Sequence, residues 1–435
     1  MQRTARYILL STLIGLGLSA CRSDISDSDD ISAPSTETAF DASSLWSEIR
    51  DDFDLFYAYR DDRGFDADAY LDKVGALVSA APDSATFRRD LHRATYAFTD
   101  PHLGFGPAED SDFNIIPTAS DLQINHHDGR YLVVDVRAIS SARKKGIRPG
   151  WVLESAGGAP FAPQVGALFE GLVDTPSDAQ LDYAATLIAN GLRIGDRQLG
   201  FLTPDGEARI ITLRNPRKMA AAFMKRPHVE SYQILSMDGS EIAVLRINNR
   251  LGDNDLIEIF DAAIAEAQEA HGLILDLRNT PSGGNAEVGR SIMGHFTKTA
   301  APFQIHERPS LDREFGVPRR YVEYVLPRAP YYDSARTVVL GGYWTGSMGE
   351  GIVIGMDAMG VQTIASDMGD LLGGMSQFSY ADSTITLSIP TEALFHVDGT
   401  PREDFIAAQP LTSADRHETG LDPAMEAAIS YLRNQ

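Results

Sequence analysis

The sequence predicts a mixed protein in which a helical N-terminal segment and a β-rich unit precede an α/β core. Three observations support this prediction. Apolar residues recur at helical spacing between residues 41 and 98, and short strand-like runs follow as far as residue 214. From residue 215 to the C-terminus, strand-like and helix-like patterns alternate. The chain has 435 residues, of which 43% are hydrophobic, so it can bury several large cores.

Charge and cysteine content exclude several classes of function. Lys and Arg number 38 against 61 Asp and Glu, a formal net charge of −23. Such an acidic surface repels phosphate backbones, so we expect no nucleic-acid partner. The one cysteine, Cys21, allows no intrachain disulfide or cysteine cluster. None of the ten histidines has H-E-x-x-H or another metal-binding spacing. We therefore expect neither a metal nor a cofactor.

The pattern of the N-terminal residues predicts a targeting signal. Arg3 and Arg6 precede a short apolar stretch, residues 7–18, which is brief for a membrane span. The following "LSAC" (18–21) resembles a bacterial lipobox. That resemblance implies removal of residues 1–20 as a lipoprotein signal peptide and acylation of Cys21, which would hold the protein to a membrane by lipid. An ordinary secretory signal with a chance cysteine is the alternative.

The lipobox also implies a place in the cell. The mature protein would sit in the bacterial cell envelope and face the periplasm. Arg22 stands where an Asp retains many lipoproteins at the inner membrane, which favours the outer membrane. Residues 21–40 are rich in Ser and Asp and poor in apolar residues, so we expect a disordered tether.

Residues 41–105 form the predicted helical subdomain. Two apolar faces carry the prediction: Leu45, Ile49, Phe53 and Phe56, then Phe87, Leu91, Ala94 and Phe98. Pro101 disfavours helix at Asp100, so the last helix should end near that residue. His102 is then expected in the loop that follows.

Residues 117–214 form the predicted β-rich unit, with strands expected over 131–138, 151–158 and 208–214. The stretch "SARKKGIRPGWVLESAGGAPF" between the first two resembles a PDZ domain, although Trp151 stands where many PDZ domains have Asp. PDZ modules bind chain ends by adding a strand to a sheet edge. The resemblance implies a module that selects or presents protein ends. Some other small β domain is the alternative.

Residues 215–435 form the predicted α/β core. Helices are expected over 255–270 and after Ser347, and strands over 241–248, 272–278, 337–343 and 383–389. Two turns stand out. Ser347 and Glu350 make S-x-x-E after a strand-like run, which is either a capping box or a nucleophile at a helix N-terminus. The turn with Gly283 and Gly284 offers either oxyanion-binding amides or a plain turn.

Three stretches together resemble the C-terminal processing and tricorn-core serine peptidases. They are D-L-R…G-G (276–284), T-G-S-M-G-E (345–350) and D-P-H (100–102), and the tail at 411–432 resembles the closing helix of the family. The resemblance implies a ClpP/crotonase-like layered α/β core with an inserted PDZ-like domain. It also implies a membrane-anchored serine endopeptidase that cleaves unfolded or C-terminally exposed proteins.

The resemblance also implies a set of site residues. Ser347 would be the nucleophile, and the backbone amides of Met348 and of Gly283 or Gly284 would bind the oxyanion. The turn is one residue longer than the common form, so the choice between the glycines stays open.

The absence of a lysine after Ser347 decides which catalytic base the resemblance implies. One branch of the family places a lysine some 25 residues after the serine, but the last lysine here is Lys298, and the corresponding stretch offers Asp367 and Asp370. The tricorn-like branch uses a histidine after the N-terminal helices, which His102 matches, oriented by a glutamate that Glu403 matches. Slippage by one residue to Asp404 stays open. Met368 departs from the Thr that tricorn-like members often have.

Two alternatives compete with this prediction. A non-catalytic lipoprotein on the same fold could bind peptides or other ligands. An α/β-hydrolase could use Ser347, Asp398 and His417, but Thr345 departs from the G-x-S-x-G elbow.

Overall fold

The computed structural model describes residues 40–61, 64–235, 239, 241–381, 383–414 and 422–435. Cys21, the predicted signal peptide and most of the predicted tether lie outside these residues. Asp41–Gln435 form one compact unit. Among the helices described, none combines the length and the apolar character that a membrane span requires.

Three capped helices open the unit, as predicted for residues 41–98. Asp41, Asp66 and Asp83 each accept a hydrogen bond from a first-turn amide, which fixes where each helix begins. The last helix ends earlier than predicted, because a 3₁₀ turn replaces its final residues and Thr99 takes a left-handed conformation with φ +52°. The elements are α1 (Ala42–Phe56), α2 (Ala67–Val78), α3 (Ser84–Thr95) and η1 (Tyr96–Phe98).

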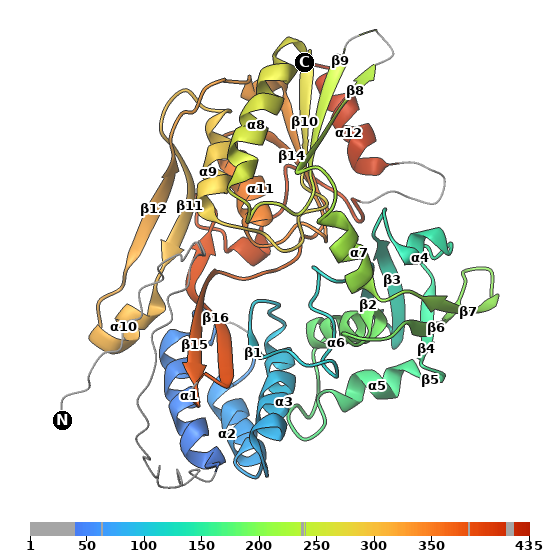
Figure 1. Ribbon diagram of the computed structural model, residues 1–435, viewed down its shortest axis with the longest axis vertical. Helices are drawn as coiled ribbons and strands as arrows, with labels where there is room; N and C mark the ends of the chain where they lie inside the picture. The colour runs from blue at the N-terminus through green and yellow to red at the C-terminus, as the bar shows by residue number, and fades with distance from the viewer. Residues whose placement is uncertain (1–39, 62–63, 236–238, 240, 382, 415–421) are drawn as a thin grey trace, which may run out of the picture. The chain divides into compact units, whose positions relative to one another are not determined.

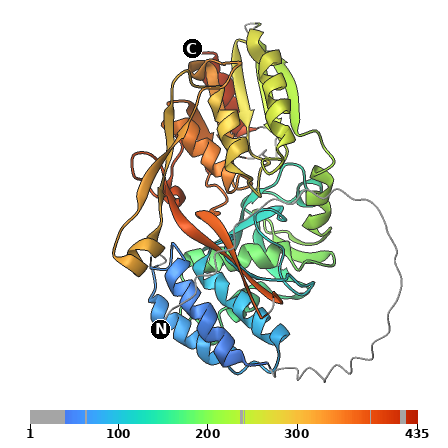
Figure 2. The same ribbon diagram turned by 60° about the vertical axis from the view of Figure 1, so that its left-hand side comes forward.

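An antiparallel five-stranded sheet joins these helices to the C-terminal part of the chain. Strand β1 (Gly104–Gly106) begins two residues after His102 and pairs with β16 (Ile385–Phe395), with Gly104 opposite Ser388. The sheet continues with β15 (Gly374–Tyr380), β11 (Ala301–Glu307) and β12 (Arg320–Val325), and α10 (Pro309–Phe315) lies between the last two in sequence. Residues of β15 and β16 share one hydrophobic core with α1–α3. Figures 1 and 2 show the two strands beside these helices. The strand expected over 383–389 therefore exists but belongs to this sheet.

The inserted unit, residues 122–213, has an antiparallel sheet of its own. The strand order is β2-β3-β4-β6-β7, and the three predicted strands are present in slightly shorter form. The unit has a separate core that includes Phe161, Phe169 and Phe201. Its elements are β2 (Leu122–His127), β3 (Arg130–Val136), α4 (Ser141–Lys144), β4 (Val152–Ala156), β5 (Ala159–Pro160), α5 (Phe161–Ala167), α6 (Asp178–Asn190), β6 (Arg197–Leu202) and β7 (Ala208–Leu213).

The predicted α/β core is a six-stranded sheet in the order β17-β14-β13-β10-β9-β8. All neighbours are parallel except β8 with β9. Figure 1 shows α8, α9 and α11 on one face and α12 on the other. Its elements are α7 (Pro216–Phe223), β8 (Val229–Leu235), β9 (Glu241–Ile247), α8 (Asp255–Glu266), η2 (Ala267–Glu269), β10 (Gly272–Asp276), α9 (Ala286–Gly294), η3 (Ser334–Arg336), β13 (Thr337–Gly341), α11 (Met348–Ala358), β14 (Gln362–Ala365), η4 (Arg402–Asp404), β17 (Gln409–Pro410) and α12 (Pro423–Leu432).

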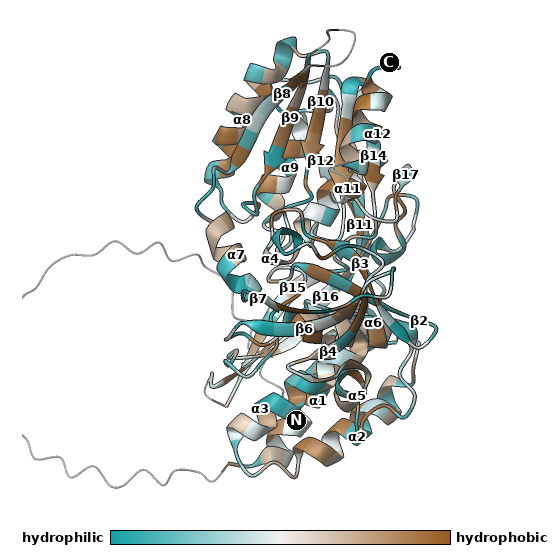
Figure 3. Ribbon diagram, turned by 90° about the vertical axis from the view of Figure 1, so that its right-hand side faces the viewer, coloured by the Kyte–Doolittle hydropathy of each residue, from teal (hydrophilic) through white to brown (hydrophobic). Residues whose placement is uncertain are grey.

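Burial on both faces explains the apolar strand sequences of this sheet. Alternate residues enter two cores, so that Leu273 and Leu275 pack towards α8 and α9 while Ile274 packs towards α12. The apolar colouring of β9 and β10 in Figure 3 reflects this double burial. Because β10 and β13 are parallel neighbours, their carboxyl ends meet at one edge, and the turns after them lie side by side.

Candidate active site

Ser347 lies on a strained turn between β13 and α11. Its backbone has φ +52° and ψ −116°, whereas an ordinary N-cap serine adopts the extended region. This conformation is sterically unfavourable for a residue with a side chain. Backbone strain of this kind is frequent at functional sites. The side chain is half-buried at the N-terminus of α11. The turn therefore holds Ser347 in a backbone conformation that helix capping alone does not require.

Glu350 fixes the backbone of this turn. Its carboxylate accepts a hydrogen bond from the amide of Ser347, as the capping-box pattern predicts. It also accepts from the amide of Leu371 at 3.3 Å and from the Arg402 guanidinium at 3.1 Å. Burial raises the pKa of Glu350, and the charge of Arg402 opposes this shift.

Arg402 is a site residue that the sequence reasoning missed. Its guanidinium donates to the carbonyl of Ser347 as well as to Glu350, and both charged side chains are almost fully buried. The pair therefore holds both backbone groups of Ser347. Nothing in the sequence near Arg402 signals this contact, because the partners lie 52 to 55 residues away.

Of the two glycines left open by the sequence, Gly283 faces the serine. It has φ +60°, and a Cβ on it would lie 2.2 Å from the Cβ of Ser347 and 2.6 Å from the amide nitrogen of Met348. A Cβ on Gly284 would instead lie 1.9 Å from the carbonyl carbon of Leu251. Glycine at 283 therefore keeps clear the space beside Ser347 and the Met348 amide. As the first residue of α11, Met348 has an amide without a carbonyl partner four residues earlier in the helix.

Hydrogen bonds join the glycine turn to the serine turn. The amide of Thr280 donates to the carbonyl of Trp344 at 3.0 Å, and the amide of Gly346 donates to the carbonyl of Thr280 at 3.0 Å. These bonds continue the pairing of β10 and β13 beyond the strands. The positions of Gly283 and Ser347 are thus fixed relative to each other.

His102 lies in the loop after the N-terminal helices, as predicted. Its Nδ1 is 2.6 Å from the carbonyl oxygen of Leu372, and its amide donates to Asp100 at 2.9 Å. A carbonyl oxygen only accepts hydrogen bonds, so Nδ1 carries the proton and neutral His102 has its lone pair on Nε2. Burial lowers the pKa of His102 to about 4. The hydrogen bond to Leu372 raises the pKa, but burial has the larger effect. The ring is therefore neutral at pH 7, in the tautomer that a base needs at Nε2.

The two candidate acids at 403 and 404 differ in exposure. Glu403 is half-buried in η4, whereas Asp404 is exposed. Burial raises the pKa of Tyr59, and the charge of Glu403 raises it further, so the carboxylate lies near that phenol. The Nδ1 bond that the family resemblance assigns to a glutamate is made by the carbonyl of Leu372.

A cavity of about 500 Å³ adjoins these residues. Pro101, Leu372, Glu350, Arg402 and Glu403 form part of its lining. Asp367, Met368 and Asp370 line it as well, so the stretch that holds a lysine in the other branch forms a wall here. Residues of β2 and α6 complete the lining from the inserted unit.

Two residues of the α/β-hydrolase alternative, Ser347 and Asp398, lie in the described part of the chain. The side chain of Asp398 accepts a hydrogen bond from the amide of Thr400 in the same turn, and it lies 2.9 Å from the ring of His396. His417 lies outside the described residues.

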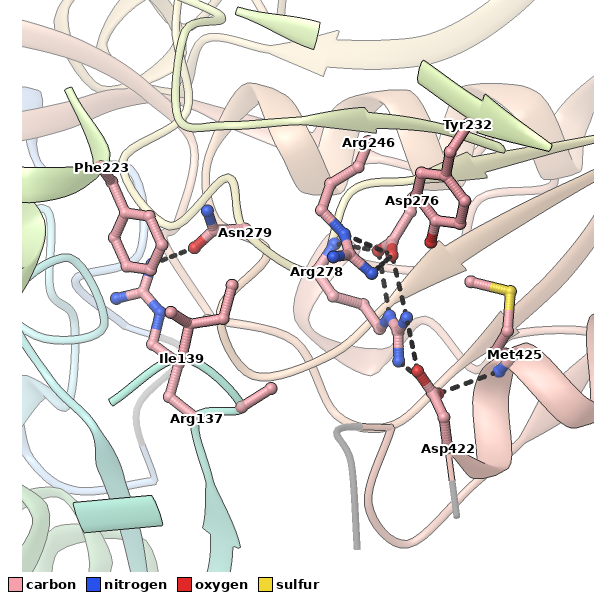
Figure 4. Close-up of a pocket in the computed structure, with 11 residues that line it drawn as sticks. Arg137, Ile139, Phe223, Tyr232, Arg246, Asp276, Arg278, Asn279, Asp422 and Met425 are labelled. Atoms are coloured by element: carbon pink, nitrogen blue, oxygen red, sulfur yellow. Dashed lines mark hydrogen bonds and ion pairs between the residues drawn. The ribbon is translucent and has the colours of Figure 1, made fainter. Parts of the chain in front are cut away.

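The D-L-R motif serves a different purpose from the glycines that follow it. Asp276 is buried between Arg246 and Arg278, and Arg278 also reaches Asp422 at 2.6 Å, as Figure 4 shows. Asp422 in turn caps α12 through the amide of Met425. The two arginines lower the pKa of Asp276 despite its burial. This network borders a second cavity of about 410 Å³ and fastens α12 to the end of β10.

The inserted unit and the segment that leads into it each contact one turn of the site. Arg137, just after β3, donates to the side-chain oxygen of Asn279 at 2.6 Å, four residues before Gly283. Trp344 donates from Nε1 to the hydroxyl of Ser120 at 2.9 Å, three residues before Ser347. Within the described ranges, no group of three or more His, Cys, Asp or Glu residues is arranged to hold a metal ion.

Comparison with solved structures identifies the fold. Mature CPAF in complex with lactacystin matches with a TM-score of 0.59 and 14% identity, over 91% of this chain and 97% of that one. The photosystem II D1 C-terminal processing protease matches with a TM-score of 0.54 and 14% identity, over 86% of this chain and 93% of that one. No protein-family model and no curated protein sequence matches the chain. The chain thus has the fold of the C-terminal processing proteases, which confirms the family resemblance at the level of fold.

Proposed function

We propose that this protein is a serine endopeptidase with Ser347 as its nucleophile. The observation that carries the proposal is the strained backbone of Ser347, at φ +52° and ψ −116°, on a turn that faces Gly283. A buried ion pair holds this conformation through both backbone groups of Ser347. A helix cap needs neither the strain nor the facing glycine.

In the proposed reaction, Oγ of Ser347 attacks the carbonyl carbon of a peptide bond and passes its proton to Nε2 of His102. The amides of Met348 and Gly283 hydrogen-bond the oxyanion of the tetrahedral intermediate. His102 then gives the proton to the leaving amine as the carbon–nitrogen bond breaks. Water, activated by the same ring, cleaves the resulting ester and restores Ser347.

Glu403 keeps a supporting role in this proposal. Because Nδ1 is bonded to the Leu372 carbonyl, that carbonyl fixes the tautomer of His102. Glu403 lines the same cavity as Pro101, which precedes His102 in the sequence, and Leu372, which bonds the His102 ring. Its negative charge would favour the imidazolium that forms during the reaction.

The proposed substrate is an unfolded or end-exposed stretch of protein. The segment that carries Cys21 lies outside the described residues, so the lipid anchor and the envelope location rest on the lipobox alone and are part of the proposal. The PDZ-like and ClpP/crotonase-like assignments are likewise proposals, supported by the strand order of the inserted unit and by the mostly parallel sheet of the core.

Cleavage of an unfolded protein tests the proposal. The full chain and Ser347→Ala are incubated with a reduced, alkylated protein, and mass spectrometry maps the new ends. We expect internal cleavage by the wild type and none by Ser347→Ala. Equal cleavage by both would exclude Ser347 as the nucleophile. Saturable binding of the substrate without cleavage would favour the non-catalytic alternative.

A further inference from the structure

The inserted unit has an edge strand of the kind to which peptides add. Strand β2 stands first in the order β2-β3-β4-β6-β7, so one side of it has no strand neighbour in this sheet. PDZ modules, which residues 117–214 resemble, bind chain ends by adding a strand at such an edge. Strand addition needs the backbone N–H and C=O groups that alternate residues direct away from the sheet.

Side chains of α6 already bond these groups on β2. The hydroxyl of Thr186 accepts from the amide of Ile124 and donates to the carbonyl of the same residue, each at 3.0 Å. The side-chain amide of Asn190 does the same for Leu122, with Oδ1 3.3 Å from its nitrogen and Nδ2 2.8 Å from its oxygen. Each side chain thus exchanges two hydrogen bonds with one strand residue, as a residue of a neighbouring antiparallel strand would.

The helix and the strand match in spacing as well as in chemistry. Asp182 accepts from the amide of His126, so positions 182, 186 and 190 of α6 serve residues 126, 124 and 122 of β2. Four helical residues rise about 6.0 Å and two strand residues about 6.8 Å, so the two series stay in step. Thr186 and Asn190 are 2% and 0% exposed. The bonds of Thr186 and Asn190 to β2 are therefore buried, whereas the bond of Asp182 is partly buried.

We propose that α6 occupies the edge of β2 as a bound strand would, so that the inserted unit does not take a peptide chain end by strand addition. An incoming peptide would have to break these buried bonds and displace α6. The helix is also fastened to the N-terminal segment, because Gln180 donates to the carbonyl of Ala97 at 2.8 Å. This inference replaces the expectation that the unit presents substrate ends. It does not depend on Ser347 being a nucleophile.

Hydrogen exchange of single amides tests the occupied edge. In the full chain, the amides of Ile124 and His126 should exchange as slowly as buried amides of β3. Thr186→Val keeps the shape but removes both bonds, and should speed exchange at Ile124 about tenfold or more, since each lost bond shifts the local opening equilibrium. Thr186→Ser keeps the hydroxyl and should resemble the wild type. Fast exchange at Ile124 and His126 in the folded wild type would overturn the proposal.

Peptide binding gives the second test. Labelled peptides with a free C-terminal carboxylate and their C-terminal amides are titrated into Ser347→Ala protein, so that no cleavage intervenes. We expect no binding that depends on the free carboxylate and protects residues 122–126 from exchange. Carboxylate-dependent binding with protection of those amides would contradict the proposal. Binding that protects other segments instead would support it, since chain ends would then be recognised elsewhere.

Discussion

Nδ1 of His102 is hydrogen-bonded at 2.6 Å to the carbonyl oxygen of Leu372, a backbone atom from the distant C-terminal part of the chain. The bond sets the tautomer of the ring without a carboxylate. It also ties the N-terminal loop to the segment that carries Leu371, whose amide donates to Glu350. A chain of contacts therefore runs from His102 through 371–372 and Glu350 to the backbone of Ser347.

The pH dependence of the reaction should reflect the buried state of His102. Burial lowers its pKa from 6.5 to about 4. The base form is the neutral ring, so lowering the pH removes it only near pH 4, and activity persists below pH 6. The rate of Ser347 acylation by a fluorophosphonate, measured between pH 3.5 and 8, should fall on the acid side with a midpoint of about 4. Circular dichroism over the same range shows whether the fold is retained, and a midpoint near 6.5 would contradict a buried base.

Glu403 and Asp404 form a matched pair for testing the third member of the site. Glu403→Gln should lower kcat by about tenfold to a hundredfold, because it removes the negative charge that we propose favours the forming imidazolium, while the tautomer is still held by Leu372. Asp404→Asn, on the exposed neighbour, should leave kcat unchanged. Steady-state cleavage of a fluorogenic peptide measures both. The reverse order of effects would assign the role to Asp404.

Gly283 should tolerate no side chain. Gly283→Ala would bring a methyl group to 2.2 Å from the Cβ of Ser347 and beside the Met348 amide. We expect a loss of activity of about 10² or more, the size found when an oxyanion donor is removed. The left-handed backbone at φ +60° should add about 1–2 kcal/mol of destabilisation, which thermal unfolding can measure. A folded Gly283→Ala protein with wild-type activity would rule out this glycine as part of the oxyanion site.

The Glu350–Arg402 pair should matter for stability and for the position of Ser347. Glu350→Gln keeps the shape but leaves the charge of Arg402 buried without its partner, so unfolding should become easier by about 3–5 kcal/mol. Arg402→Met removes the second charge. The double variant Glu350→Gln, Arg402→Met should therefore regain part of the stability lost in Glu350→Gln. Urea denaturation measures the coupling, and strictly additive losses would show that the two charges are not paired.

The double variant also separates stability from positioning. It should recover stability without recovering acylation of Ser347. The carbonyl of Ser347 has lost its donor, Arg402, and the amide of Ser347 has lost its carboxylate acceptor on Glu350. If Ser347 of the double variant were acylated at the wild-type rate, the turn would keep its conformation without the Glu350–Arg402 pair.

Asp276 should contribute to folding rather than to chemistry. Asp276→Asn would leave Arg246 and Arg278 around a neutral amide, and we expect a loss of about 3–5 kcal/mol of unfolding free energy. Asp422→Asn should cost less, since asparagine still caps α12 and Arg278 keeps Asp276. Chemical denaturation of the two variants gives the comparison. Equal losses of unfolding free energy would show that Asp422 contributes as much to the network as Asp276.

The sequence predicted the elements whose signals are local. The apolar runs at 241–248, 272–278 and 337–343 are buried strands because both faces of the sheet are covered. The turns after two of them meet because parallel neighbours end at the same edge. The apolar helix faces that begin at Leu45 and Phe87 predicted the N-terminal helices, and therefore also the loop that holds His102.

Other features depend on contacts without a local signal. Leu372 bonds His102 through its backbone carbonyl, so its side chain gives no indication of the role. Arg402 meets Ser347 and Glu350 only in the folded chain. The strand at 385–395 has the pattern of any half-buried strand, and only tertiary packing places it beside α1–α3. For the same reason, nothing local in the sequence indicates that Thr186 and Asn190 of α6 bond the backbone of β2.

Fluorophosphonate labelling of the full chain, with the adduct mapped by mass spectrometry, tests the central claim most directly. Wild type is compared with Ser347→Ala and His102→Ala, each checked for folding by circular dichroism. We expect one adduct, on Ser347, formed at least about 10³ times faster in the wild type than in His102→Ala. A folded wild-type protein that forms no adduct on Ser347, or one that forms it equally fast without His102, would contradict the account.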